Sequence, residues 1–172
     1  MQPRDGALWY QIAMIQAGQK IPSVTIKQAT PEGGAEVDAA ALFAGKKVVM
    51  FSLPGAFTPT CSAKHLPGYV AKLPELKAQG VDLVVCLSVN DAWVMKAWAE
   101  AHDALGKITM LADGEGKLTK ALGIEIEIPG MGLRARRGVM TIIDGTVKSI
   151  EVEAPGKFEV SSAEACLVNL HK

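Results

Sequence analysis

Residues 54–62 read PGAFTPTCS and directly follow the apolar run KKVVMFSL. They set one cysteine, Cys61, among prolines, a glycine and small hydroxyl residues. A cysteine packed in a core needs apolar neighbours at regular spacing, and this segment does not provide them. If a helix begins here, its unpaired N–H groups and positive dipole stabilise a thiolate. The segment therefore predicts a nucleophilic cysteine rather than a packed one.

The neighbours of Cys61 suit such a site. Thr58, three residues earlier, can present its hydroxyl to the sulfur or to a bound oxygen. Pro54 and Pro59 stiffen the loop, and Gly55 allows another backbone segment to approach closely. We therefore expect a stiff loop with Thr58 near the sulfur.

A lowered thiol pKa requires more than the helix terminus. Moving the pKa from ~8.5 to ~6 takes about 3.4 kcal/mol. A helix terminus supplies roughly 0.3–2 kcal/mol, and a hydrogen bond to a charged group about 1.5–3 kcal/mol. Neither interaction alone supplies the ~3.4 kcal/mol, so a nearby cation is expected as well. The sequence offers Arg134, Arg136 and Arg137 immediately before the apolar segment GVMTII.

Strand signals surround this segment. Short apolar runs bounded by glycine or proline predict strands at 24–29, near 36, and at 46–53, 81–89, 108–112, 138–144 and 146–153. Gly33 with Gly34 is expected at the turn of the first hairpin and Gly145 at the turn of the last. The runs at 46–53 and 81–89 are apolar throughout, so we expect both faces of these strands to be buried.

Helical spacing of apolar residues predicts four helices, beginning near residues 61, 91, 113 and 161. The expected signals at their ends are Asn90 or Asp91, Asp113 with Gly123, and a capping box of Ser161 and Glu164. Pro67 is expected to bend the first helix.

The order of these elements predicts an α/β fold, with a central mixed sheet flanked by helices and with an N-terminal hairpin. Residues 14–172 are expected to form a single domain, because the chain is long enough for one core and shows no linker or repeat. Residues 1–13 are interpreted as an extension outside the fold, since the sequence from Met14 resembles a domain opening.

Composition excludes several kinds of function. Lys plus Arg and Asp plus Glu number 18 each, and no basic run exceeds RARR at 134–137. Neither nucleic acid nor a membrane is therefore an expected partner. The cysteines at 61, 86 and 166 are too few for a disulfide framework and lack the spacing of a zinc site. They are expected to be reduced, which predicts a cytoplasmic location.

The segment PGAFTPTCSAKHLPGY resembles the active-site segment of the peroxiredoxins, and most closely that of the peroxiredoxin-five group with the plant type II enzymes. The resemblance continues through GVDLVVCLSVNDAWVMKAWAEA, LADGEGKLTKALGIE, GLRARRGVM and EVEAPGKFEVSSAE, and so covers nearly everything from Met14 onward. It implies a thioredoxin-like fold and a thiol-dependent peroxidase that needs no metal and no organic cofactor.

The resemblance also implies the site residues. Pro54, Thr58 and Cys61 match the family pattern P-x-x-x-T-x-x-C, in which Cys61 is the peroxidatic cysteine. Arg137 matches the arginine that completes the site. Family members usually have an aromatic residue next, whereas this chain has Gly138, so the pocket wall is either more open or filled from elsewhere.

A member of this family is expected to reduce hydrogen peroxide and small alkyl hydroperoxides in antioxidant defence. The thiolate attacks one peroxide oxygen to give a sulfenic acid and water or an alcohol, while Thr58, backbone N–H groups and Arg137 hold the two oxygens. An external thiol, from glutathione with glutaredoxin or from thioredoxin, then regenerates Cys61. A homodimer is the expected assembly.

The other two cysteines are interpreted as buried core thiols. Cys86 lies where the plant type II enzymes place a second cysteine, which makes it the candidate resolving cysteine. A cysteine in the middle of a strand cannot move without local unfolding, however, and Cys166 falls on the apolar face of a helix. We favour a one-cysteine cycle closed by an external thiol. His65, one turn after Cys61, is expected to have a structural hydrogen-bonding role rather than that of a base.

Other conspicuous residues receive structural interpretations. Arg134 and Arg136 are read as a solvated basic face, and Trp93 and Trp98 as core or subunit contacts. The segment 123–133, GIEIEIPGMGL, is expected to be a loop at the rim of the pocket and, by resemblance, a dimer contact.

Two further functions use the same cysteine. A thioredoxin-type disulfide oxidoreductase normally has CxxC, and Thr58 occupies the position of the first cysteine, which argues against it. A redox sensor or chaperone-like protein could use Cys61 as a switch without turnover. Fast reaction with peroxide and steady turnover with a thiol favour the enzyme; slow, stoichiometric oxidation favours the sensor.

Overall fold

The computed structural model describes residues 14–172, and the expected extension at 1–13 lies outside the described residues. The elements, in chain order, are β1 (Thr25–Thr30), β2 (Gly33–Asp38), α2 (Ala39–Phe43), β3 (Lys47–Ser52), the π-helical turn η1 (Cys61–His65), α3 (Leu66–Ala78), β4 (Leu83–Ser88), α4 (Ala92–Ala101), β5 (Thr109–Ala112), α5 (Lys117–Ala121), β6 (Glu125–Ile128), β7 (Gly132–Ala135), β8 (Gly138–Ile143), β9 (Thr146–Val152) and α6 (Ala163–Leu170).

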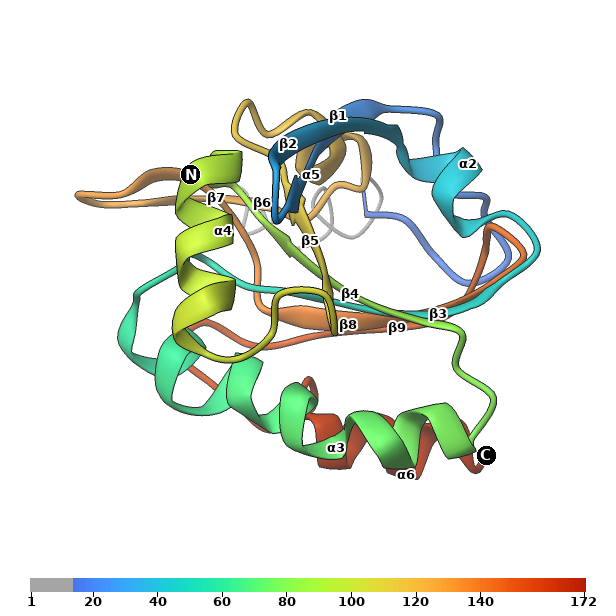
Figure 1. Ribbon diagram of the computed structural model, residues 1–172. Coiled ribbons are helices and arrows are strands. Elements are labelled where there is room, and N and C mark those ends of the chain that lie inside the picture. Colours follow the sequence, from blue (N-terminus) through green and yellow to red (C-terminus); the bar gives the residue numbers. More distant parts are fainter. Residues whose placement is uncertain (1–13) are drawn as a thin grey trace, which may run out of the picture.

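Seven strands form one mixed sheet in the order β2-β1-β5-β4-β3-β8-β9 (Figure 1). The central pairs β5–β4 and β4–β3 are parallel, and the outer pairs are antiparallel. Helices α3 and α4 are the crossovers that parallel neighbours require. The predicted α/β architecture, with its N-terminal hairpin and its late antiparallel hairpin, is confirmed.

The central strands are apolar on both faces, as predicted. In β3, Val49 and Phe51 belong to one core cluster, whereas Val48 and Met50 belong to the other, because successive side chains of a strand point to opposite faces. Helices α3, α4 and α6 pack on the first cluster, and α2 and α5 on the second (Figure 1). No helix among residues 14–172 is long and apolar enough to cross a membrane.

The first hairpin differs from the prediction at its turn. The chain reverses at Pro31 and Glu32, and Gly33 and Gly34 are the first residues of β2. Proline suits the early position of a turn because its φ is fixed. Gly34 has a packing role instead, since a Cβ there would lie 3.0 Å from the Cβ of Ala92 at the start of α4.

Two further elements were assigned wrongly from the sequence. The segment 123–133 is not a loop, because it contains β6 and the start of β7, which pair as a separate two-stranded hairpin. The last helix is capped by Ser162, whose side chain accepts from the N–H of Ala165, and not by Ser161. Asp91 caps α4 as expected.

Candidate active site

The loop after β3 brings its residues into close contact. A Cβ on Gly55 would lie 3.1 Å from Nη1 of Arg134 and 3.3 Å from Cγ2 of Thr58, so a larger residue there would require these side chains to shift. Phe57 adopts a left-handed conformation with φ of 61°, which costs a non-glycine residue roughly 1–2 kcal/mol. The following residues are helical from Pro59 onward. The loop is therefore rigid and locally strained, as loops at functional sites often are.

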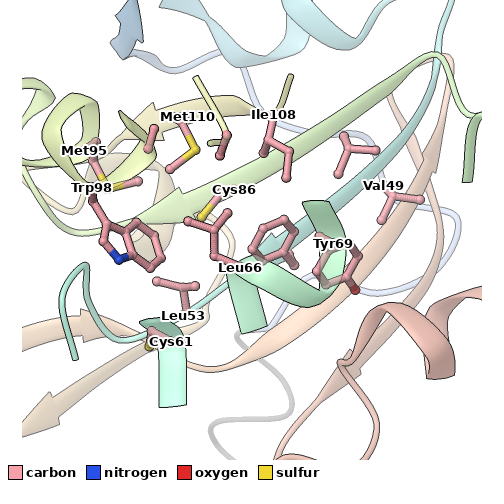
Figure 2. Close-up of a cluster of buried hydrophobic side chains, with 14 of the residues drawn as sticks. Val49, Leu53, Cys61, Leu66, Tyr69, Cys86, Met95, Trp98, Ile108 and Met110 are labelled. Atoms are coloured by element: carbon pink, nitrogen blue, oxygen red, sulfur yellow. The ribbon is translucent and has the colours of Figure 1, made fainter. Parts of the chain in front are cut away.

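Cys61 lies in the first turn of this helical segment. The first helical bond runs from the N–H of Ser62 to the carbonyl of Thr58, at 2.9 Å. The N–H of Leu66 then donates to the carbonyl of Cys61, which makes 61–65 a π turn, a feature frequent at functional sites. The Cys61 side chain is buried beneath Leu53 at one end of the apolar cluster (Figure 2).

Arg137 supplies the cation that the sequence required. Its Nη2 donates to Sγ of Cys61 at 3.1 Å. Arg137 lies immediately before β8, and β8 pairs with β3 so that Gly138 faces Ser52. The hydroxyl of Ser52 also donates to the carbonyl of Arg136 at 2.7 Å. Strand pairing thus places the guanidinium beside the loop that follows β3.

His65 fixes the other half of the guanidinium. Its Nδ1 lies 2.9 Å from Nη1 of Arg137, and its Nε2 lies 3.0 Å from the carbonyl oxygen of Ser161. A carbonyl can only accept, so Nε2 carries the proton and Nδ1 accepts from Arg137. Burial, followed by the charge of Arg137, lowers the pKa of His65 to about 3. The ring is neutral and positions Arg137, in keeping with the expected structural role.

Thr58 and Pro54 form hydrogen bonds with partners other than the thiol. The hydroxyl of Thr58 donates to the carbonyl of Gly55 at 2.7 Å, rather than to the sulfur. Its oxygen is thereby left as an acceptor. The carbonyl of Pro54 accepts from Nη1 of Arg134 at 3.4 Å, which anchors the start of the loop.

The interpretation of Arg134 as a solvated residue is wrong. Its Nε donates to the carbonyl of Met131 at 3.2 Å, and its Nη1 donates to those of Pro54 and Val89. The planar fork suits several acceptors at once. Arg134 ties the loop after β3 to the end of β4 and to the β6–β7 hairpin, a contact that no local sequence signal revealed.

The close pairing of β8 with β9 explains why residue 138 is a glycine. A Cβ there would lie 2.7 Å from the carbonyl oxygen of Glu151 on the paired strand β9. An aromatic ring from another segment lies beside the arginine. The ring of Phe158 lies 5.8 Å from Cζ of Arg137 and 5.1 Å from the ring of His65.

The comparisons with known proteins agree with this geometry. A sequence model of the Redoxin family matches residues 16–167. Peroxiredoxin-2E-2, chloroplastic, of Oryza sativa is 46% identical over 91% of this chain and 72% of its own length. The chain belongs to the peroxiredoxin family. It is therefore a thiol-dependent peroxidase, an oxidoreductase with a thioredoxin-like fold. Reduced Prx3 of Vibrio vulnificus in complex with H2O2 is 53% identical, with a TM-score of 0.88 over 91% of this chain and 99% of that one.

The relatives correct the expected compartment. Peroxiredoxin-2E of Arabidopsis thaliana, 43% identical over 90% of this chain and 69% of its own length, is also named as chloroplastic. The prediction of a cytoplasmic location is therefore wrong. It rested on reduced cysteines, and Cys61, Cys86 and Cys166 are indeed free. Free thiols indicate a reducing environment, but they do not distinguish one reducing compartment from another.

The two other cysteines of this peroxiredoxin are buried. Cys86 lies in the middle of β4 among apolar side chains (Figure 2), and burial, with a smaller effect of Cys61, raises its thiol pKa well above the usual value. Burial also raises the pKa of Cys166 to about 11. Both are poor nucleophiles in this state.

The tryptophans occupy different environments. Trp98 is fully buried and donates from Nε1 to Oγ of Ser62 at 3.0 Å, next to Cys61. Trp93 is 78% exposed. Among residues 14–172, no group of three or more His, Cys, Asp or Glu side chains is arranged to hold a metal ion.

Proposed function

We propose that this peroxiredoxin reduces hydrogen peroxide and small alkyl hydroperoxides through a sulfenic acid on Cys61. The observation that carries the proposal is the 3.1 Å bond from Nη2 of Arg137 to Sγ of Cys61. The guanidinium donates to the sulfur that would attack the peroxide, and this sulfur lies in the first helical turn after the loop. The sulfur is buried, which favours small oxidants. The peroxide complex of the Vibrio vulnificus neighbour supports the same substrate class.

The proposed step assigns a task to each residue. The thiol first loses its proton to solvent. The thiolate attacks one peroxide oxygen, a sulfur–oxygen bond forms and the oxygen–oxygen bond breaks, and the departing oxygen takes up a proton from solvent to leave as water or an alcohol. Arg137 stabilises the charge that moves onto the oxygens. The hydroxyl of Thr58 already donates to the carbonyl of Gly55, so its oxygen accepts a hydrogen bond from the peroxide. Pro54 holds the loop through its carbonyl.

Regeneration is proposed to need an external thiol, either glutathione with glutaredoxin or thioredoxin. Burial and raised pKa values make Cys86 and Cys166 poor resolving residues. These observations support a one-cysteine cycle over a disulfide between Cys61 and Cys86.

A homodimer is proposed as the assembly. Phe57 and Trp93 are large apolar side chains that are 57% and 78% exposed. The N–H of Ala56 donates to Oδ1 of Asn90 at 3.0 Å, which brings the loop that carries Phe57 close to the start of α4, the helix that carries Trp93. Such a patch fits a subunit contact. Sedimentation of Trp93→Glu as a monomer, beside a dimeric parent protein, would support this face.

Mass spectrometry of the peroxide-treated protein tests the function directly. A sulfenic acid adduct at Cys61 alone is expected. A disulfide from Cys61 to Cys86 or Cys166 would instead establish a two-cysteine cycle. Adducts spread over all three thiols at similar, slow rates would contradict a dedicated peroxidatic cysteine.

A further inference from the structure

A buried carboxylate lies behind the active site, outside the residues considered so far. Glu153 directly follows β9 and is only 5% exposed. Its N–H donates to the carbonyl of Arg137 at 2.8 Å, so its backbone already holds the residue that contacts Cys61. A buried charge needs compensating partners, and the chain supplies them from one short segment.

Four donors converge on a single oxygen of this carboxylate. Oε1 of Glu153 accepts from the N–H groups of Glu159, Val160 and Ser161 at 2.7, 2.7 and 2.9 Å, and from the hydroxyl of Ser161 at 2.9 Å. Burial raises the pKa of Glu153, but these hydrogen bonds outweigh it and the pKa is lowered overall. The carboxylate is thus the anchor of the loop that leads into α6.

The anchored loop is in direct contact with the catalytic cation. The carbonyl of Ser161, on the residue held twice by Glu153, accepts from Nε2 of His65 and from the hydroxyl of Tyr69 at 2.8 Å. It thereby fixes the tautomer in which Nδ1 of His65 accepts from Arg137. Phe158, in the same loop, packs against the guanidinium.

We infer that Glu153 is a positioning residue of the peroxidase site. It holds Ser161 so that His65 keeps its Nε2–H tautomer, and His65 in turn keeps the Arg137 guanidinium on the sulfur of Cys61. This inference rests on the proposed role of Cys61 in peroxide reduction. It explains why a charge is buried behind the site. It also explains why two serines follow one another before α6: Ser162 caps the helix, and Ser161 binds Glu153.

The test compares Glu153→Gln with Glu151→Gln, which makes the same change at an exposed position two residues earlier. We expect Glu153→Gln to lower the second-order rate with hydrogen peroxide about tenfold, which corresponds to about 1.4 kcal/mol, and to shift the pH dependence of Cys61 alkylation upward. Glu151→Gln should match the parent protein. A merely structural role for Glu153 would lower the melting temperature without changing the pH dependence.

Nitrogen-15 NMR of the histidine rings provides a readout that is independent of activity. In the parent protein, His65 should show a protonated Nε2 and an unprotonated Nδ1. In Glu153→Gln we expect a mixture of tautomers. An unchanged tautomer together with an unchanged rate would overturn the inference and leave the peroxidase assignment intact, whereas full activity in Cys61→Ser would overturn the assignment and leave the NMR result standing.

The variant Ser161→Ala provides a second test in case the Glu153→Gln protein does not fold. It keeps every backbone bond and removes one of the four donors to Oε1. A loss of rate of about threefold is expected for one hydrogen bond to a charged acceptor among several, with ring signals shifted in the same direction. A folded Ser161→Ala protein with the parent rate and parent ring signals would contradict the inference by itself.

Discussion

Nη2 of Arg137 lies 3.1 Å from Sγ of Cys61, although 76 residues separate the two in sequence. The contact depends on the antiparallel register of β3 and β8, in which Ser52 faces Gly138. A slip of one residue in that register would turn the arginine to the opposite face of the sheet. The reactivity of Cys61 is therefore encoded as much by strand pairing as by its own loop.

Replacing Arg137 by lysine should impair catalysis while keeping the charge. An ammonium group cannot serve both Nδ1 of His65 and Sγ of Cys61 with the fixed fork of a guanidinium. We expect the second-order rate constant with hydrogen peroxide to fall about tenfold or more in stopped-flow measurements. This corresponds to a rise of at least about 1.4 kcal/mol in the activation free energy. Arg136→Lys is the matched control at the preceding residue, and equal rates in the two variants would refute the role of the fork.

The loop around Cys61 could be read from the sequence because its information is local. Prolines, a glycine, a hydroxyl residue and a helix start all lie within PGAFTPTCS, and the apolar runs on either side identify the buried strands. The resemblance of this segment to a known family added the role of Arg137. The fold class and the family followed from these features together.

What the sequence did not reveal depends on contacts between distant segments. Ser161 was expected to cap a helix, yet its N–H and hydroxyl bind Glu153, because the neighbouring Ser162 takes the cap. Arg134 was expected in solvent, yet it binds three carbonyls from separate loops. Both residue types suit the expected role and the observed one, so only the tertiary structure decides between them.

The three cysteines should differ in peroxide consumption. Cys61→Ser is expected to abolish it, whereas Cys86→Ser and Cys166→Ser should retain it with a small-thiol reductant, because both thiols are buried and have raised pKa values. Cys86→Ser also buries a hydroxyl among apolar side chains, which should destabilise the fold by about 1–3 kcal/mol. Turnover assays with thermal melts measure both effects. Retained activity in Cys61→Ser would defeat the assignment.

His65 should make the protein sensitive to acid. Its folded-state pKa is about 3, against 6.5 for the free side chain, so the unfolded chain binds a proton in this interval that the folded protein does not. The resulting stability is fully present above pH 6.5 and is lost progressively as the pH falls toward about 3, by up to about 1.4 kcal/mol per pH unit.

Urea unfolding at several pH values measures this effect. In His65→Gln the free energy of unfolding should depend less on pH between pH 6.5 and 4, because glutamine does not titrate there. The slope should correspond to up to one proton fewer taken up on unfolding. The exposed His171 supplies the control His171→Gln, which should keep the slope of the parent protein. Identical slopes in all three proteins would show that the imidazole of His65 is not held neutral.

Gly138 should not tolerate even alanine. The added Cβ would lie 2.7 Å from the carbonyl oxygen of Glu151 and 3.4 Å from Cα of Val152, and both are backbone atoms of the paired strand. Separating β8 from β9 should cost about 1–3 kcal/mol and displace the adjacent Arg137, so both the melting temperature and the peroxide rate should fall. Gly68→Ala is the control, because a Cβ there meets nothing within 4 Å and should stabilise α3 by about 0.5–1 kcal/mol. A Gly138→Ala protein as stable and as active as the parent would show that the strand pair has room for the missing side chain.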